Sequence, residues 1–301
     1  MQKPKQLYIL PFDHRSTFRS NLFGWDEPIN KAQVQKIKDT KQIIWQAFLK
    51  VHLKSSFKEY LGILVDEQFG SEILKKAKKM NIVTILTTEK SGQKVFDFEY
   101  GKDFDKHILK FKPDYAKVLV RYNPSNKKNN LMQLKRLKKI NNFCQKKKIG
   151  LLFELLVPAT DKQLEVYKDK FNYDKKARPN LTKRAIKEIR VFGIEPDIWK
   201  LEAMEKKSDW PMIIKEIKKD NKKDFKIIVL GRAAPKKVVK YWLKNAAGFE
   251  EIFGFAIGRT IFSPSLKKYR DKKINKKETI DLIAKNYQFF IKYWQKFKVF
   301  K

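Results

Sequence analysis

Eight short apolar runs alternate with stretches of helical periodicity along the 301 residues, and this alternation limits the fold more than any other feature. The runs are rich in Val, Ile and Leu and are apolar on both faces, which is typical of parallel strands covered by helices. They span residues 7–12, 61–65, 82–86, 116–122, 149–157, 197–201, 225–231 and 254–258.

The segments between these runs have the apolar spacing of helices. Strands that alternate with helices form right-handed βαβ units, and eight such units close naturally into a barrel. An open doubly wound sheet is the alternative, but no G-x-G-x-x-G pattern follows the first run. The sequence therefore predicts an α/β fold, a (β/α)8 TIM barrel, with helices over Lys31–His52, Glu72–Met80, Asn130–Lys147, Thr182–Phe192, Asp209–Asp220 and Lys236–Asn245.

The chain is expected to form one domain over residues 1–301, because no linker rich in Pro, Gly or Ser divides it. Its last segment, KKETIDLIAKNYQFFIKYWQKFKVFK, carries aromatic residues at helical spacing. This pattern predicts a C-terminal aromatic-rich helix packed against the barrel. A subunit contact in a homo-oligomer is the second interpretation of the same aromatics.

The charge is strongly positive: 69 Lys plus Arg stand against 33 Asp plus Glu, a formal net charge of +36. Such an excess suggests a polyanion such as nucleic acid as a partner. The lysines are scattered as pairs and triplets through the predicted helices, however, and form no single arm or tail. We therefore favour compositional background over nucleic-acid binding.

The single cysteine, Cys144, excludes an intramolecular disulfide and suits a reducing compartment. The sequence shows no secretory leader and no apolar run of membrane-spanning length. We expect a cytoplasmic protein with no membrane partner.

Charged residues and glycines gather at the ends of the predicted strands, where barrels of this type carry their chemistry. Any one of them could be an ion-paired or snorkelling side chain. An unpaired buried charge costs several kcal/mol. A ring of positively and negatively charged side chains at one end of the barrel therefore predicts a polar functional site. In chain order the residues are Asp13, Arg15, Asp66, Glu89, Lys117, Arg121, Glu154, Lys200, Glu202, Gly231, Arg232, Gly258 and Arg259. Of these, Arg15, Asp66, Arg121 and Glu202 are expected to contact the substrate or its phosphate.

Lys200 offers the most specific chemistry, because it lies in the middle of an otherwise apolar run. A lysine is a nucleophile at neutral pH only where burial or a neighbouring cation lowers its pKa. In barrel order Lys117 would approach from two strands away and Glu154 from the strand between, placed for proton transfer. This set suits Schiff-base formation on a ketone and carbon–carbon cleavage. The alternative is a structural ion pair of Lys200 with Glu154 or Glu202.

Two Gly-Arg pairs follow the last two strands, where these barrels usually hold a phosphate. Glycine permits close backbone approach, and arginine binds phosphate through two parallel hydrogen bonds. Gly231-Arg232 and Gly258-Arg259 are therefore predicted to bind a phosphate of the substrate.

No metal and no cofactor are expected. The three histidines, His14, His52 and His107, lie far apart in the sequence and lack metal-ligand spacing. The strand-end carboxylates could hold a divalent ion for a metal-dependent aldolase reaction, but the neighbouring lysines would repel it.

Five segments together resemble the bacterial DUF2090 family: LYILPFDHRSTF, EKSGQKVFDFEYG, ARPNLTKRAIKEI, PDIWKLE and GFAIGRTIF. Members of that family occur alone or fused behind a sugar kinase, and are regarded as 5-dehydro-2-deoxyphosphogluconate aldolases of inositol catabolism. The resemblance runs from Leu7 to about Phe262. More distantly, the sequence is similar to class I tagatose-1,6-bisphosphate aldolases.

The resemblance implies a (β/α)8 barrel and a Schiff-base lyase that needs no metal. It implies that Lys200 forms the imine, that Glu154 shuttles protons and that Lys117 is their electrostatic neighbour. Asp13 would be a polar group near the reacting carbons. Gly258 and Arg259 would form the phosphate site, and Glu89 would lie on a substrate-side loop. One departure concerns substrate identity: where the family pattern has LGLDAP, this chain has LGRAAP at residues 230–235, so Arg232 replaces an apolar residue and the acidic residue is missing.

The sequence thus predicts a class I aldolase acting on a phosphorylated keto-sugar acid, in particular 5-dehydro-2-deoxygluconate 6-phosphate. Its products would be dihydroxyacetone phosphate and malonate semialdehyde. The first alternative is a class I aldolase of the tagatose or fructose bisphosphate type. The second is a non-catalytic basic barrel that binds nucleic acid, with an affinity that falls steeply with salt.

Overall fold

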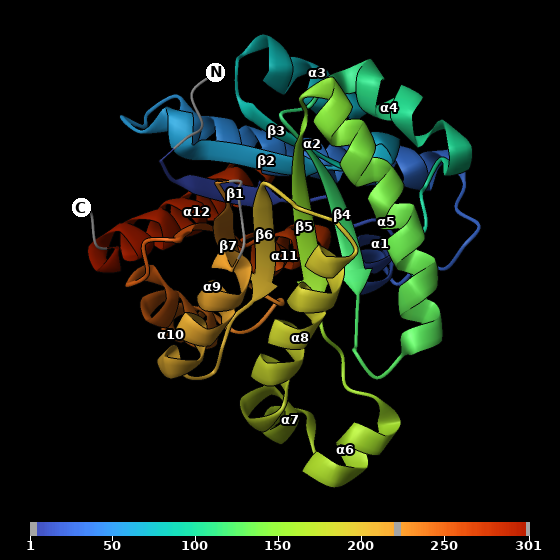
Figure 1. Cartoon of the computed structure of the whole chain (residues 1–301). Helices are drawn as coiled ribbons and strands as arrows, with labels where there is room; N and C mark the ends of the chain where they lie inside the picture. Colours follow the sequence, from blue (N-terminus) through green and yellow to red (C-terminus); the bar gives the residue numbers. More distant parts are fainter. Residues whose placement is uncertain (1–4, 220–223, 299–301) are drawn as a thin grey trace.

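Eight parallel strands close into one barrel, with helices on its outside (Figure 1). The computed structural model describes residues 5–219 and 224–298. Each strand pairs with the next in chain order, and the last pairs with the first, so the predicted (β/α)8 barrel is confirmed. The strands are β1 (Leu7–Pro11), β2 (Leu61–Val65), β3 (Val83–Thr87), β4 (Tyr115–Arg121), β5 (Gly150–Leu156), β6 (Ile198–Glu202), β7 (Lys226–Leu230) and β8 (Ile252–Ala256).

The helices surround the barrel and include every predicted one. In chain order they are α1 (Ser16–Phe23), α2 (Lys31–His52), α3 (Glu67–Lys79), α4 (Phe104–Phe111), α5 (Lys127–Lys147), α6 (Asp161–Tyr167), α7 (Lys170–Lys176), α8 (Arg178–Val191), α9 (Trp210–Lys218), α10 (Lys236–Ala247), α11 (Arg259–Arg270) and α12 (Lys276–Phe297). The predicted helix from Asp209 would end at Asp220, which lies outside the described residues.

Helix α3 begins at Glu67 rather than at the predicted Glu72, because Asp66 caps it. The Asp66 carboxylate accepts a hydrogen bond from the backbone N–H of Phe69 at 2.8 Å. A capping carboxylate satisfies one of the free N–H groups of a first helical turn and so favours an early start.

Helix α12 is the predicted aromatic-rich C-terminal helix, and its aromatic face is largely core. Tyr287 and Trp294 are fully buried, and the Tyr287 hydroxyl donates to the backbone oxygen of Tyr8 at 2.6 Å. Half-buried Phe289 is covered by the Lys236 ammonium, 3.6 Å from the ring centroid. Core packing therefore explains this face, and a homo-oligomer stays a prediction.

The barrel interior changes from apolar to charged along the strands. Side chains two apart on a strand share a face. Leu152 and Ile198 belong to the apolar cluster that fills the interior, and Glu154 and Lys200 follow two residues later on the same strands. Lys117 occupies the corresponding place on β4, two residues beyond the Tyr115 of that cluster. The charged layer is therefore an inward-facing layer at the C-terminal half of the barrel.

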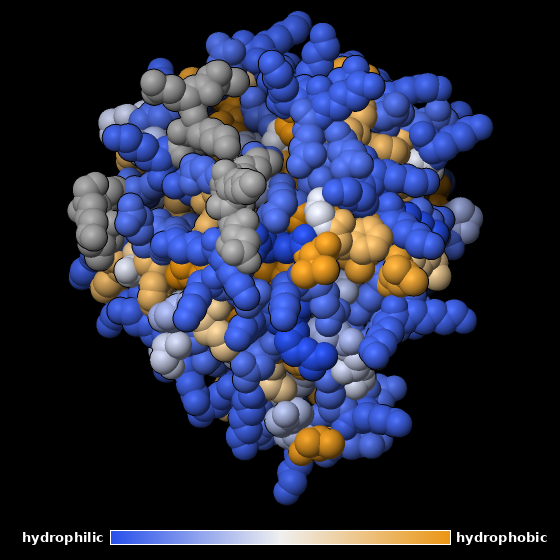
Figure 2. All heavy atoms as spheres, in the orientation of Figure 1, coloured by the Kyte–Doolittle hydropathy of each residue, from blue (hydrophilic) through white to orange (hydrophobic). Residues whose placement is uncertain are grey.

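The outer surface is mostly hydrophilic on the face drawn in Figure 2, and hydrophilic side chains surround its apolar patches. Among the described helices, none combines the length and the apolar character needed to cross a membrane.

Candidate active site

A cavity of about 580 Å³ opens where the strands end. It brings together all but one of the site residues predicted from the sequence. The predicted residues that line it are Asp13, Arg15, Glu89, Lys117, Arg121, Glu154, Lys200, Glu202, Gly231, Arg232, Gly258 and Arg259. The structure thus supports their proximity, while their chemical roles stay predictions.

Glu154 joins the two lysines of the cavity. Its Oε1 lies 2.9 Å from the Nζ of Lys200, and its Oε2 lies 2.9 Å from the Nζ of Lys117. The sequence suggested direct repulsion between the two ammonium groups, but the carboxylate lies between them. Burial raises the pKa of Glu154, yet the charges of Lys117 and Lys200 outweigh it, and the net pKa is lowered.

Lys117 is surrounded by three carboxylates. Its Nζ lies 2.6 Å from Glu89 Oε1 and 3.0 Å from Asp13 Oδ2, in addition to its contact with Glu154. Burial alone would lower the pKa of Lys117, but the charges of Asp13, Glu154 and Glu89 raise it well above its usual range. Lys117 is therefore a permanent cation that holds three acidic side chains in place.

Asp13 and His14 follow β1 at the edge of this cluster. The Thr87 hydroxyl donates to Asp13 Oδ2 at 2.9 Å. Burial opposes ionisation of Asp13, but the charges of Lys117 and Lys200 help to lower its pKa well below the usual range. Burial also lowers the pKa of His14 to about 3, which leaves a neutral imidazole near neutral pH. The sequence singled out His14 without giving it a role in the site.

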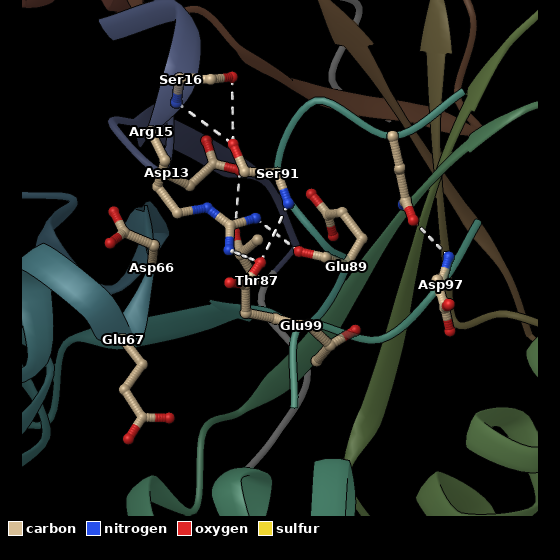
Figure 3. A network of polar contacts seen from close by, with 12 residues as sticks. Asp13, Arg15, Ser16, Asp66, Glu67, Thr87, Glu89, Ser91, Asp97 and Glu99 are labelled. Atoms are coloured by element: carbon tan, nitrogen blue, oxygen red, sulfur yellow. Dashed lines mark hydrogen bonds and ion pairs between the residues drawn. The ribbon is translucent and has the colours of Figure 1, made fainter. Parts of the chain in front are cut away.

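Arg15 is engaged by the loop that follows β3 (Figure 3). Its guanidinium donates to the backbone oxygen of Glu89 at 2.5 Å and to the Glu99 carboxylate at 2.6 Å. The same carboxylate accepts from the backbone N–H of Ser91 at 3.0 Å, and the Ser16 N–H donates to the Ser91 hydroxyl at 3.2 Å. Arg15 was predicted to contact the substrate or its phosphate, but its donors face the protein and tie two cavity loops together.

Asp66 is the predicted site residue that does not line the cavity. Besides capping α3, its carboxylate pairs with the ammonium of Lys41, and both side chains are almost fully buried. In Figure 3 Asp66 lies with Glu67 at the start of α3. The prediction that Asp66 contacts substrate is wrong in its placement, because a buried lysine and a helix N-terminus take up both oxygens.

Arg232 is also paired within the protein. It contacts Asp174 at 2.7 Å and Glu202 at 3.1 Å, and its own backbone adopts a positive φ of 50°. Asp174 in turn holds the fully buried Arg178 at 2.7 Å. The arginine that departs from the family pattern therefore closes a four-membered network of alternating charges rather than presenting a free guanidinium.

Arg259 and Arg121 remain open to an anion. Within residues 5–219 and 224–298, neither has a carboxylate at ion-pair distance, and Arg121 donates only to the backbone oxygen of Gln93 at 2.6 Å. Arg259 begins α11, directly after Gly258. A side chain on Gly258 would place a Cβ 2.1 Å from the backbone oxygen of Pro11, so only glycine fits there. Gly258, Arg259 and Thr260 thus line the cavity at the start of α11, and a helix N-terminus that carries an arginine is an arrangement that binds phosphate.

A larger hollow of about 1210 Å³ lies at the opposite end of the barrel, where the strands begin. Two of its carboxylates bond to the backbone: Asp114 accepts from the N–H of Thr84 at 2.8 Å and Asp197 from that of Leu151 at 2.9 Å. We give it less weight than the strand-end cavity because these groups join strands. Elsewhere too, no group of three or more His, Cys, Asp or Glu among the described residues has the geometry of a metal site.

The sequence did not identify the side chains that form ion pairs with the predicted site residues. Lys41, Glu99, Asp174 and Arg178 lie on helices or loops, away from any predicted strand end. Two segments quoted for the resemblance contained a signal: ARPNLTKRAIKEI includes Arg178 and EKSGQKVFDFEYG includes Glu99, but neither residue was given a role.

The closed eight-stranded barrel places the protein in the class of (β/α)8 barrels, and solved structures share this fold. The fructose-bisphosphate aldolase of Plasmodium falciparum aligns with a TM-score of 0.65 at 12% identity, covering 99% of this chain and 93% of its own. A Schiff-base-forming fructose-1,6-bisphosphate aldolase gives 0.56 at 12% identity, with coverage of 95% and 94%. A Corynebacterium glutamicum protein gives 0.57 at 13% identity, with coverage of 95% and 86%.

The chain itself belongs to the DUF2090 family, described as uncharacterized proteins conserved in bacteria, whose family model matches residues 1–298. No curated protein matches the sequence. At identities of 12–13% the likeness to these three structures establishes the fold alone.

Proposed function

We propose that this protein is a class I aldolase that cleaves 5-dehydro-2-deoxygluconate 6-phosphate. The observation that carries the proposal is the contact between Lys200 and Glu154 in a buried cavity at the strand ends. The resemblance of the sequence to the inositol-pathway aldolases supports the substrate. The Schiff-base mechanism of a structurally similar aldolase supports the reaction type.

In the proposed reaction, Lys200 passes a proton to Glu154, and the neutral amine attacks the substrate ketone. Glu154 returns the proton as water leaves, and the resulting iminium ion accepts the electron pair of the carbon–carbon bond. Lys117 keeps Glu154 oriented through its contact of 2.9 Å. Proton transfer by such a positioned carboxylate contributes about 10²–10⁴-fold to the rate.

The cations of the cavity suit a substrate with an anionic group at each end. Arg259 follows β8 and Arg121 ends β4, and these strands are opposite each other in an eight-stranded barrel. Arg259 with the first turn of α11 would take the phosphate, and Arg121 the carboxylate. Lys200, on β6 between them, would then meet the ketone.

The test is the release of dihydroxyacetone phosphate, followed by coupling to glycerol-3-phosphate dehydrogenase and NADH oxidation. Wild-type protein should release it from 5-dehydro-2-deoxygluconate 6-phosphate, and the Lys200→Met variant should not. Faster cleavage of fructose or tagatose 1,6-bisphosphate would support the aldolase reaction but assign that bisphosphate as the substrate. Release from none of the three would refute the proposed function.

A further inference from the structure

Cleavage of the carbon–carbon bond needs a base for the substrate hydroxyl, and the most obvious carboxylate is poorly available. Both oxygens of Glu154 are engaged, one by Lys200 and one by Lys117, each at 2.9 Å. An oxygen that already accepts from an ammonium group is a weak acceptor for a further proton.

Glu89 has the free oxygen that such a base requires. Its Oε1 contacts Lys117 at 2.6 Å, whereas its Oε2 is buried and has no hydrogen-bond partner in the described part of the chain. The residue is 5% exposed and lines the same cavity as Lys200. Since an unsatisfied buried oxygen costs about 1–3 kcal/mol, it marks a place where a ligand donor belongs.

The loop around Glu89 is fixed from several sides. The Arg15 guanidinium donates to its backbone oxygen at 2.5 Å, and the residue bridges to Phe98 across the loop. The preceding residue, Thr88, donates from its backbone N–H at 3.0 Å and its hydroxyl at 2.8 Å to the backbone oxygen of Lys117. Figure 3 shows Glu89 on its loop and the Arg15 contacts that hold the loop. The free oxygen is therefore held in a fixed position.

We propose that Glu89 is the catalytic base that takes the hydroxyl proton during carbon–carbon cleavage, while Glu154 serves the imine nitrogen and the enamine carbon. This inference rests on the proposed function and assigns one of its proton transfers. Arg15 acts through Glu89 as a positioning residue.

The step balances without an oxidant or reductant. The hydroxyl proton moves to Glu89 Oε2, and the oxygen forms a carbonyl as the adjacent carbon–carbon bond breaks. The electron pair of that bond enters the iminium group on Lys200 and gives an enamine. After the aldehyde leaves, Glu89 releases its proton to water, and the enamine carbon takes a proton from solvent through Glu154.

The experiment separates cleavage from enamine formation by using dihydroxyacetone phosphate. This ketone can form the enamine on Lys200, but it has no hydroxyl beta to the carbonyl and so undergoes no cleavage. The Glu89→Gln variant should lose about 10²–10⁴-fold in single-turnover cleavage of the ketose phosphate. Its exchange of the carbon-bound hydrogen of dihydroxyacetone phosphate in D2O, followed by NMR, should stay close to wild type. Glu154→Gln should lose both activities.

Asp13→Asn is the matched comparison, because Asp13 is another carboxylate bound to Lys117. Any loss in this variant should affect cleavage and exchange alike. The proposal is overturned if Glu89→Gln cleaves normally, if it loses exchange in parallel with cleavage, or if the selective loss of cleavage appears in Asp13→Asn instead. A folded Glu89→Gln protein is verified by its thermal unfolding. Borohydride trapping on Lys200 in wild type tests the proposed function separately, so the two failures are distinguishable.

Discussion

The ammonium of Lys200 and the carboxylate of Glu154 meet at 2.9 Å on adjacent strands whose register pairs the two residues directly. Neither group is near the surface, and the apolar layer of the barrel lies immediately below them. A buried pair of this kind is costly unless both charges are satisfied. The second lysine, Lys117, completes the arrangement on the other side of the carboxylate.

Replacing Glu154 with glutamine should reduce turnover by about 10²–10⁴-fold, because the group that exchanges protons with Lys200 is lost. The shape of the side chain is kept, so the fold should persist. Steady-state kinetics and the rate of borohydride trapping measure the effect. Unchanged trapping would mean that another group takes the proton from the lysine.

Replacing Lys117 with methionine should destabilise the fold by about 3–5 kcal/mol near neutral pH, because three buried carboxylates lose their shared cation. Their mutual repulsion raises the pKa values of Asp13 and Glu154 in the variant, which should therefore regain stability as the pH is lowered and these two carboxylates take up protons. Urea unfolding at two pH values measures this. Lys75→Met, at an exposed pair with Glu72, is the control and should change little. A Lys117→Met protein as stable as the control would contradict the account.

Acid should weaken the wild-type fold through Asp13 and Glu154. Burial opposes their ionisation, but the lysine charges prevail, and both pKa values are lowered in the folded state. Their contribution is therefore fully present above the ordinary values of 3.8 and 4.5 and is lost as the pH falls through the lower folded values. Urea unfolding along a pH series should show this loss, with the opposite trend in Lys117→Met over the acidic range. A wild-type stability that rises on acidification would contradict the assignment.

Arg259→Gln should weaken inhibition by inorganic phosphate about 10- to 100-fold, the loss expected for a charge-assisted hydrogen bond. Arg15→Gln is the matched comparison, because its guanidinium is bound to Glu99 and to the Glu89 backbone. Phosphate affinity should be nearly unchanged there. An equal loss in both variants would place Arg15 back among the phosphate ligands.

Asp66→Asn should reduce stability by about 3–5 kcal/mol, because Lys41 is left buried without a counter-charge. Asparagine still caps a helix well, so the start of α3 should survive. The KM for substrate should not change, since Asp66 lies outside the cavity. The double variant with Lys41→Met should recover part of the stability. A raised KM in the single variant would show that Asp66 reaches the substrate.

The sequence predicted the barrel and the strand side chains that point into it, because the apolar periodicity of the strands indicates both. Lys200 and Glu154 could be placed together from their positions within two neighbouring apolar runs. Asp66 was misplaced because an acidic residue after a strand has the same signature as a helix cap. The pairing of Arg232 with Asp174 joins segments far apart in the chain, and a single sequence carries no signal for it.

The most direct test of the account is reduction with borohydride in the presence of dihydroxyacetone phosphate, with the modified peptide identified by mass spectrometry. The account predicts one adduct, on Lys200, and none in Lys200→Met. An adduct on a different lysine, or no adduct under conditions where the enzyme turns over, would contradict it.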